Sequence, residues 1–418
     1  MNSIEQIITR AENELRECFS EIEANEEART RQVLNSFRRF GVSYRHFAPT
    51  TGYGYDDIGR DTLEKIYADL FHTEAALMRP HVASGTAALS LTLFGLTKPG
   101  ERILSATGMP YDTLQTVIGT GKKTPPGSLK EMGIGFDCVE LKEGRIDVGS
   151  VEKAISADTR LIIAQRSRGY ALRPSLRPED FEELAEMIHA RHPDIRLMVD
   201  NCYGEFVCKD EPTDHGADVC VGSLIKNPGG GIAPTGGYIV GKTEDIERIA
   251  YRLTAPGLGR ELGSYAASYR PFYQGLFMAP HTVTQALKTA IVTSRVFEEL
   301  GFSAIPASHE RRADIIQAIR FGKPELLVAF CQGIQTASPV DSMALPEPWD
   351  MPGYEDPVVM AAGTFVAGAS IELSADGPMR EPYTAYMQGG LTYIHGRIAL
   401  TEALTKMRDS GIVSFEKA

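Results

Sequence analysis

A lysine stands where a strand-like segment runs into a glycine-rich turn. Lys226 follows the mostly apolar run 219–225 and precedes a turn that contains three consecutive glycines, 229–231. Upstream, Asp200 ends a second mostly apolar run, 195–200. A lysine amine forms covalent bonds with carbonyl compounds, and a carboxylate can keep a heterocyclic nitrogen protonated. The two residues therefore predict covalent chemistry on a ring-bearing carbonyl compound.

An earlier segment predicts an anion site. Residues 83–89, Ala-Ser-Gly-Thr-Ala-Ala-Leu, follow the strand-like residues 76–78 and open an apolar helical stretch. Ser84 can cap this helix, Gly85 lets the backbone approach an anion closely, and the N–H groups from Thr86 onward point toward it. Ser-Gly-Thr is also a common helix cap where no ligand binds. The anion site is indicated only because this helix start, Asp200 and Lys226 follow one another in this order along the chain.

The amine, the carboxylate and the anion site match the needs of pyridoxal 5'-phosphate. Lys226 would hold the aldehyde of this cofactor as a Schiff base. Asp200 would keep its ring nitrogen protonated, and Ser84, Gly85 and Thr86 would bind its phosphate together with Ser223. Without a cofactor, Lys226 would be a surface lysine at a glycine-rich turn, and Asp200 would be an aspartate that caps the next turn.

Segment 199–237 carries a more specific resemblance. The run Val-Asp-Asn-Cys-Tyr-Gly at 199–204 and the run Gly-Ala-Asp-Val at 216–219 resemble the aspartate strand and the approach to the lysine in fold-type I pyridoxal phosphate enzymes. The chain is similar to the Cys/Met-metabolism lyases, and most of all to the branch called aluminium resistance or methionine gamma-lyase-like proteins, from about Tyr53 to its end. The resemblance implies carbon-sulfur lyase activity on an amino acid.

The resemblance also implies roles for two tyrosines. Tyr111 occupies the position of the family's aromatic residue that stacks on the cofactor ring and can serve as acid or base. Tyr55 matches the Tyr-x-Arg element with which a neighbouring subunit reaches the phosphate, although Asp57 stands in place of the arginine. At Ile225 the family often has a further hydroxyl, so one phosphate contact is expected to be missing.

A substrate amino acid needs an arginine for its α-carboxylate. Arg380 lies where the family keeps this arginine, and Arg168 and Arg166, at the end of a strand-like segment, compete with it. Each of the two competitors could instead bind phosphate or a second carboxylate. An asparagine that the larger transsulfuration families have near this strand end is not found here, which leaves the substrate open.

Composition narrows the possible partners. The chain has 418 residues, 43% of them hydrophobic and 23% charged, which is an ordinary globular composition. Its net charge of −12 argues against nucleic acid or an anionic membrane as the main partner. The six cysteines lack a C-x-x-C pair, so neither a disulfide framework nor a metal site is expected. We see neither a secretory signal nor a span of membrane length, and expect a cytoplasmic protein.

Strand-like and helix-like segments alternate between about 76 and 223, which predicts a mostly parallel sheet covered by helices on both faces. The fold class that the resemblance implies is α/β and aspartate-aminotransferase-like, with a seven-stranded-type sheet and a smaller α+β C-terminal domain. Such sheets bind ligands at the carboxyl ends of their strands. We expect three parts, which are an N-terminal helical arm with a dimer-contact loop (1–60), a cofactor-binding domain (61–285) and a C-terminal domain (286–418).

Two further expectations concern helices. The alternation of strand-like and helix-like segments stops at about Pro280, and a long helical pattern then covers 283–300. At the N-terminus, isoleucines and other apolar residues recur at helical spacing from Ile4 to Ile22, so this arm needs a partner surface. The resemblance implies a homodimer or homotetramer with shared active sites, in which this arm and the Tyr53 region would cover their apolar and aromatic surface.

Together with these residues, the resemblance implies a pyridoxal phosphate-dependent carbon-sulfur lyase that acts on a sulfur amino acid. Cystathionine, methionine and cysteine are candidates, and elimination from the β or the γ carbon is equally compatible with the residues. Aminotransfer or γ-replacement on the same scaffold is an alternative within the enzymes. An alternative from another class is a cofactor-binding stress protein with little catalysis.

Overall fold

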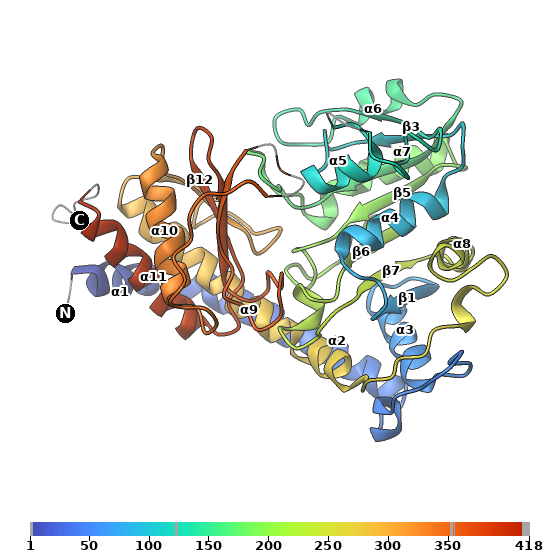
Figure 1. Cartoon of the computed structure of the whole chain (residues 1–418), viewed down its shortest axis with the longest axis horizontal. Coiled ribbons are helices and arrows are strands. Elements are labelled where there is room, and N and C mark those ends of the chain that lie inside the picture. Colours follow the sequence, from blue (N-terminus) through green and yellow to red (C-terminus); the bar gives the residue numbers. More distant parts are fainter. Residues whose placement is uncertain (1–2, 122–123, 352–353, 355, 412–418) are drawn as a thin grey trace.

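A computed structural model describes residues 3–121, 124–351, 354 and 356–411. The chain folds around two β-sheets, each with its own helices, and a long helix connects them (Figure 1). Within the described residues, no helix is both long enough and apolar enough to cross a membrane.

The larger sheet has seven strands in the order β1-β7-β6-β5-β4-β2-β3. The pairings among β2 to β6 are parallel, whereas β7 runs antiparallel to both of its neighbours. The strands are β1 (Ala75–Arg79), β2 (Arg102–Ser105), β3 (Gly135–Cys138), β4 (Thr159–Gln165), β5 (Arg196–Asp200), β6 (Val219–Ser223) and β7 (Gly237–Gly241). The predicted fold class, with a seven-stranded and mostly parallel sheet, is confirmed.

Helices cover both faces of this sheet because its strands are apolar on both faces. Along β4, Ile162 belongs to one buried cluster, while Leu161 and Ile163 belong to the cluster on the opposite face. The surrounding helices are α3 (Ile58–Leu70), α4 (Gly85–Leu96), α5 (Asp112–Ile118), α6 (Val148–Ala154), α7 (Glu182–Arg191) and α8 (Thr243–Leu253). Several of the connections between strands and helices meet at the carboxyl edge of the sheet.

The smaller sheet has five antiparallel strands in the order β10-β11-β12-β9-β8. One of its faces packs on two helices around a buried apolar cluster. The elements are β8 (Ser303–Ile305), β9 (Gln317–Arg320), β10 (Val358–Ala361), β11 (Ser374–Pro378), β12 (Thr384–Gln388), α10 (Pro324–Thr336) and α11 (Tyr393–Asp409). The opposite face of β11 and β12 is free to line a cavity.

Helix α9 (Arg270–Glu299) links the two sheets and passes position 285, where the sequence places a domain boundary. It begins well before the predicted 283–300, and Pro280 lies inside it. A proline removes one backbone donor and strains the preceding turn, which is why the sequence suggests a break there. Buried residues on both sides, among them Leu276 and Val283, hold the helix continuous against this cost.

The N-terminal arm forms α1 (Ser3–Glu14) and α2 (Arg16–Arg39). The apolar face of α1 is buried in the cluster of the small domain, and α1 contacts α11 (Figure 1). The expectation that this arm needs a surface outside its own chain is therefore wrong, because the small domain supplies that surface. Tyr53 and Tyr55, in contrast, remain 71% and 57% exposed.

Replacement of Ile8 by alanine tests the anchoring of the arm. Ile8 is fully buried, so Ile8→Ala should lower the free energy of unfolding by about 2–4 kcal/mol through lost apolar burial and a residual cavity. Urea denaturation followed by circular dichroism measures this change. Glu17→Ala, at an exposed position of α2, is the control and should change stability by less than about 0.5 kcal/mol. Equal effects of the two substitutions would contradict the anchoring.

Candidate active site

A cavity of about 480 Å³ lies between the carboxyl edge of the large sheet and the free face of the small sheet. We call it the active-site cavity. Its lining includes residues from both domains: Ser84, Gly85, Thr86, Tyr111, Gln165, Tyr170, Asp200, Cys202, Tyr203, Ser223, Ile225, Lys226, Tyr354, Asp376, Tyr386 and Gln388. Most of the residues predicted from the sequence therefore meet in one place.

Lys226 follows β6, and its amine points into the cavity. The Lys226 Nζ atom lies 3.9 Å from the centre of the Tyr203 ring. Tyr203 has a φ of +73°, a left-handed conformation that costs a non-glycine residue about 1–2 kcal/mol and is typical of functional sites. Burial favours the neutral amine, but the nearby acidic groups, led by those of Cys202 and Tyr203, outweigh it and raise the pKa of Lys226. Lys226 therefore has to lose a proton before it can attack a carbonyl carbon.

Asp200 ends β5 and is 5% exposed. The backbone N–H of Cys202 donates a hydrogen bond to Asp200 Oδ1 at 3.1 Å. Burial raises the pKa of the Asp200 carboxyl, while the charge of Lys226 and the Cys202 hydrogen bond oppose that rise. A buried carboxyl with so few donors is suited to a protonated ring nitrogen, which would hold it ionised.

The start of α4 forms an anion site where three elements meet. Ser84 caps the helix, and its Oγ accepts a hydrogen bond from the Ala87 N–H at 3.1 Å. A Cβ atom added at Gly85 would lie 3.3 Å from Ser223 Cβ and 3.5 Å from Cys202 Sγ, so a glycine permits this close approach. The first N–H groups of a helix lack intrahelical acceptors, and here they face a cavity with hydroxyl groups on its rim.

Tyr111 lies at the start of α5, beside this anion site. Its hydroxyl shares a hydrogen bond of 2.9 Å with Thr86 Oγ1, and its backbone N–H donates to Gln165 Oε1 at 3.0 Å. Burial raises the pKa of the Tyr111 phenol above its ordinary value, with a further contribution from Asp200. Tyr111 is therefore a neutral phenol that can donate a proton inside the cavity.

The candidate carboxylate arginines separate in the structure. Arg166 is fully buried outside the active-site cavity, where it donates to Asn201 Oδ1 at 2.7 Å and to the Leu176 carbonyl at 3.1 Å. Arg168 and Arg380 instead line an adjoining cavity of about 600 Å³ that shares Tyr111 with the active-site cavity. Arg166 therefore has a structural role in the buried core. Arg168 and Arg380 remain candidates for binding the substrate carboxylate.

Arg168 and Arg380 differ in their surroundings. Arg168 is buried and donates to the Ile305 carbonyl at 3.0 Å, and burial lowers the pKa of its guanidinium. Arg380 is about half exposed and pairs with Asp356 at 2.9 Å. Neither lines the active-site cavity itself. A bound amino acid would have to extend its carboxylate toward the adjoining cavity to reach them.

Tyr55 does not line the active-site cavity of its own chain. Its ring packs against the ring of Tyr53, with centres 5.7 Å apart, on an exposed loop. Arg60, the nearest following arginine, is buried and donates to the Gly54 carbonyl at 2.8 Å. The predicted phosphate contact of Tyr55 thus requires a second copy of the chain and stays a prediction.

The small domain contributes residues that the sequence analysis missed. Asp376 on β11 lines the cavity, and the Gln388 amide donates to its Oδ2 at 3.3 Å. Burial raises the pKa of the Asp376 carboxyl from 3.8 to about 6, against the lowering effect of Tyr170 and Gln388. The only hint in the sequence is an acid within a strand-like segment, next to the more conspicuous Arg380.

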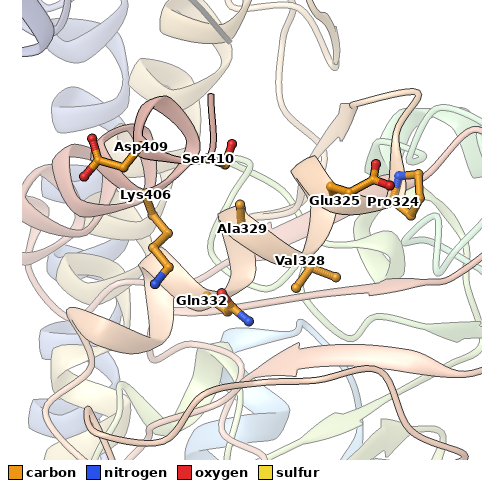
Figure 2. Close-up of a pocket in the computed structure, with 8 residues that line it drawn as sticks. All are labelled: Pro324, Glu325, Val328, Ala329, Gln332, Lys406, Asp409 and Ser410. Atoms are coloured by element: carbon orange, nitrogen blue, oxygen red, sulfur yellow. The ribbon is translucent and has the colours of Figure 1, made fainter. Parts of the chain in front are cut away.

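A separate hollow of about 530 Å³ lies on the surface between α10 and α11. Figure 2 shows its lining, which is Pro324, Glu325, Val328, Ala329, Gln332, Lys406, Asp409 and Ser410. None of the predicted site residues belongs to this lining, and it contains neither a tyrosine nor an arginine. The chemistry is therefore assigned to the active-site cavity.

The fold is that of the fold-type I pyridoxal phosphate enzymes. The active-site cavity fits this cofactor on three counts, which are an enclosed amine at Lys226, a buried carboxyl at Asp200 and a helix start that Gly85 leaves open for an anion. The family model of methionine gamma-lyase matches residues 4–408, and the chain belongs to this family. Family membership implies pyridoxal phosphate as the cofactor.

Several relatives match this chain over nearly their full length. The uncharacterized protein YnbB of Bacillus subtilis (strain 168) is 51% identical over 394 residues, which are 94% of each chain. A structure named carbon-sulfur lyase involved in aluminum resistance, from Clostridium novyi NT, is 47% identical with a TM-score of 0.93 and covers 97% of this chain and 96% of its own. A candidate cystathionine beta-lyase involved in aluminum resistance, from Listeria innocua, is 50% identical with a TM-score of 0.94 and covers 97% and 99%.

The raised pKa of Asp376 predicts a pH-dependent cost in stability. An acid whose pKa is higher in the folded than in the unfolded protein supports folding while protonated, and this support is lost as the pH rises through the folded-state pKa. The cost therefore develops between about pH 4 and pH 6, the range set by the shift from 3.8 to about 6. Its full size is about 2–3 kcal/mol.

The variant Asp376→Asn removes this charge, so its free energy of unfolding at pH 8 should be higher than that of wild type. The advantage should shrink by about 1 kcal/mol at pH 5, where much of the carboxyl is already neutral in the folded protein. Urea titrations at the two pH values measure it, with Glu325→Gln on exposed α10 as the control for lost charge. An advantage that is the same at both pH values would contradict a titrating Asp376.

Proposed function

We propose that the protein is a pyridoxal phosphate-dependent carbon-sulfur lyase that cleaves a sulfur amino acid by β- or γ-elimination. The observation that carries the proposal is the meeting of Lys226, Asp200 and the Ser84 helix start in one enclosed cavity, with the Tyr111 phenol beside them. A cavity built only to bind a ligand would not need a buried amine opposite a buried carboxyl.

Each residue has a distinct task with the cofactor. Lys226 would hold the aldehyde, Asp200 would keep the ring nitrogen protonated, and the Tyr111 ring would pack beside the cofactor ring. Ser84, Gly85 and Thr86 would bind the phosphate with the Ser223 hydroxyl, while Ile225 offers only an apolar side chain on this side. Pyridoxal phosphate, when bound, supplies an electron sink for the electron pair left at the α carbon of the substrate.

The proton steps fall to Lys226 and Tyr111. The Lys226 amine would take the proton from the α carbon of the substrate. The neutral Tyr111 phenol would donate a proton to the thiolate that leaves when the carbon-sulfur bond breaks. With one water molecule consumed, the products would be a thiol, ammonia and a 2-keto acid. Arg380 or Arg168 holds the α-carboxylate meanwhile.

The names of two similar structures support this reaction class. One is called a carbon-sulfur lyase, and the other a candidate cystathionine beta-lyase. Cystathionine is accordingly the first substrate to test, followed by methionine and cysteine. Aminotransfer uses the same residues up to removal of the α proton, but it requires a keto-acid acceptor.

Release of thiol and keto acid from these amino acids, measured without an added acceptor, tests the proposal. We expect wild type to release both products in equal amounts, and Lys226→Ala to release neither, because the amine that takes the α proton is lost. Lys209→Ala, at an exposed position after β5, is the matched control and should keep full activity. Full activity of Lys226→Ala, or dependence of wild type on a keto acid, would overturn the lyase assignment.

We also propose a homodimer or homotetramer in which a partner's loop completes each site. The exposed pair Tyr53 and Tyr55 supports this proposal, since Tyr55 cannot line the cavity of its own chain. In a two-fold dimer the same loop would be presented to the partner in both directions.

Mixing two impaired variants tests the shared site. Lys226→Ala should be inactive, and Tyr55→Ala should be weakly active at limiting cofactor. Hybrid dimers made by unfolding and refolding the mixture contain one site with both wild-type residues, so activity should return to about one quarter of wild type by random pairing. In the control mixture, Lys209→Ala replaces Tyr55→Ala. Half of the sites in that mixture keep Lys226 and all keep Tyr55, so its activity should be about one half of wild type. No recovery above the sum of the separate variants would contradict the shared site.

A further inference from the structure

Asp376 gives the small-domain wall of the active-site cavity its charge. Among the described residues of that domain that line the cavity, the others are apolar or neutral, such as Ile316, Tyr386 and Gln388. On the opposite wall, Lys226 and Asp200 are assigned to the cofactor. The Asp376 carboxylate thus faces the space where the far end of a substrate would lie.

The carboxylate of Asp376 lacks a cationic partner. No ion pair to it occurs within the described part of the chain, and Arg380, near in sequence, pairs with Asp356 instead. Asp376 Oδ2 accepts from the Gln388 amide, and the Tyr170 hydroxyl also favours the ionised carboxyl, but Oδ1 is buried without a hydrogen bond of good geometry among the described residues. Two neutral donors replace the lost hydration only in part, so the carboxylate gains from a ligand that brings a positive charge.

Three tyrosines, Tyr170, Tyr354 and Tyr386, lie near this carboxylate, and burial together with the charge of Asp376 raises the pKa of each phenol. The Tyr170 ring lies 5.1 Å from the Tyr386 ring and 5.7 Å from the Tyr354 ring, measured between centres. The Tyr386 hydroxyl donates to the Tyr170 carbonyl at 2.8 Å, which holds the two residues together across the domains. Aromatic faces attract cations, and a carboxylate among such rings forms the usual site for an ammonium group.

The strand register keeps these groups in place before any ligand binds. Asp376 on β11 is paired with Tyr386 on β12, and Ser374 with Gln388. The residues between them, Ala375 and Met387, point to the opposite face and are buried in the apolar cluster. Side chains on a paired, half-buried sheet have little freedom, so the subsite is preorganised.

We infer that Asp376 and the tyrosines around it form a subsite for a positively charged amine at the far end of the substrate. The preferred substrates are then sulfur amino acids whose leaving thiol carries an ammonium group, rather than those with a neutral thioether end. This inference rests on the proposed function, because the ligand is a substrate only if the protein is a lyase. The preference for a positively charged ligand can nevertheless be measured without turnover.

Two amino acids of equal length test the binding preference. L-Lysine and L-2-aminoheptanoic acid differ in an ammonium in place of a methyl group at the end of the side chain, and neither has a sulfur leaving group. Titration calorimetry on the cofactor-loaded protein should show lysine binding at least ten-fold more tightly. In Asp376→Asn the affinity for lysine should fall at least ten-fold, while that for 2-aminoheptanoic acid changes less than two-fold.

The control variant is Glu325→Gln, which removes one negative charge at the surface hollow of Figure 2 and should keep the lysine preference. Tyr386→Phe serves as a second probe, because it keeps the ring but loses the hydrogen bond to the Tyr170 carbonyl. It should keep part of the preference. Equal affinities for lysine and 2-aminoheptanoic acid in wild type, or a preference unchanged in Asp376→Asn, would overturn the inference.

A turnover experiment separates this inference from the lyase proposal. S-(2-aminoethyl)-L-cysteine and S-propyl-L-cysteine present the same pair of end groups on a cleavable thioether. We expect kcat/KM for the aminoethyl compound to exceed that for the propyl compound at least ten-fold, and only in the presence of Asp376. Equal cleavage of both compounds would reject the subsite and keep the lyase. Cleavage of neither, with the lysine preference intact, would keep the subsite and reject the lyase.

Discussion

The parallel pairing of β5 with β6 is the constraint on which the site depends. In this register Asp200 lies beside Val221, so Asp200 and the turn that carries Lys226 emerge at the same edge of the sheet. The parallel pairing of β4 with β5 sets Gln165, at the end of β4, beside Asp200, and Gln165 in turn holds the backbone of Tyr111. A carboxyl, an amine and a phenol separated in sequence thus meet because parallel strands end together.

Several polar groups in this cavity reduce the stability of the fold. Asp200 and Asp376 are acids with raised pKa values, and Tyr203 has a left-handed backbone. The two buried acids are unfavourable in the protein alone and become favourable once a positively charged ligand group is bound, and the strain at Tyr203 is a cost typical of functional sites. This contrast between a strained cavity and well-packed apolar clusters on the sheet faces is what is expected of a binding site rather than of a structural core.

Local signals in the sequence were enough for the large domain. The strand-then-glycine context of Lys226, the strand end at Asp200 and the helix start at Ser84 each depend on a few neighbouring residues, and the structure brings all three together. The small domain was different, because Asp376 and Tyr386 become neighbours only through strand pairing. The difference between Arg166 and Arg168 likewise depends on which way each side chain points after β4 ends, which residue type does not reveal. The arm was misjudged because its cover, around α11, lies at the other end of the chain.

The central claim is that Lys226 holds pyridoxal phosphate in this cavity. The absorption spectrum of the purified protein, recorded before and after borohydride reduction and followed by peptide mapping, tests it most directly. We predict a visible band that reduction abolishes, with the mass of the cofactor then attached to the peptide that contains Lys226. A protein that shows no such band after addition of pyridoxal phosphate, or a label on another lysine, would contradict the account.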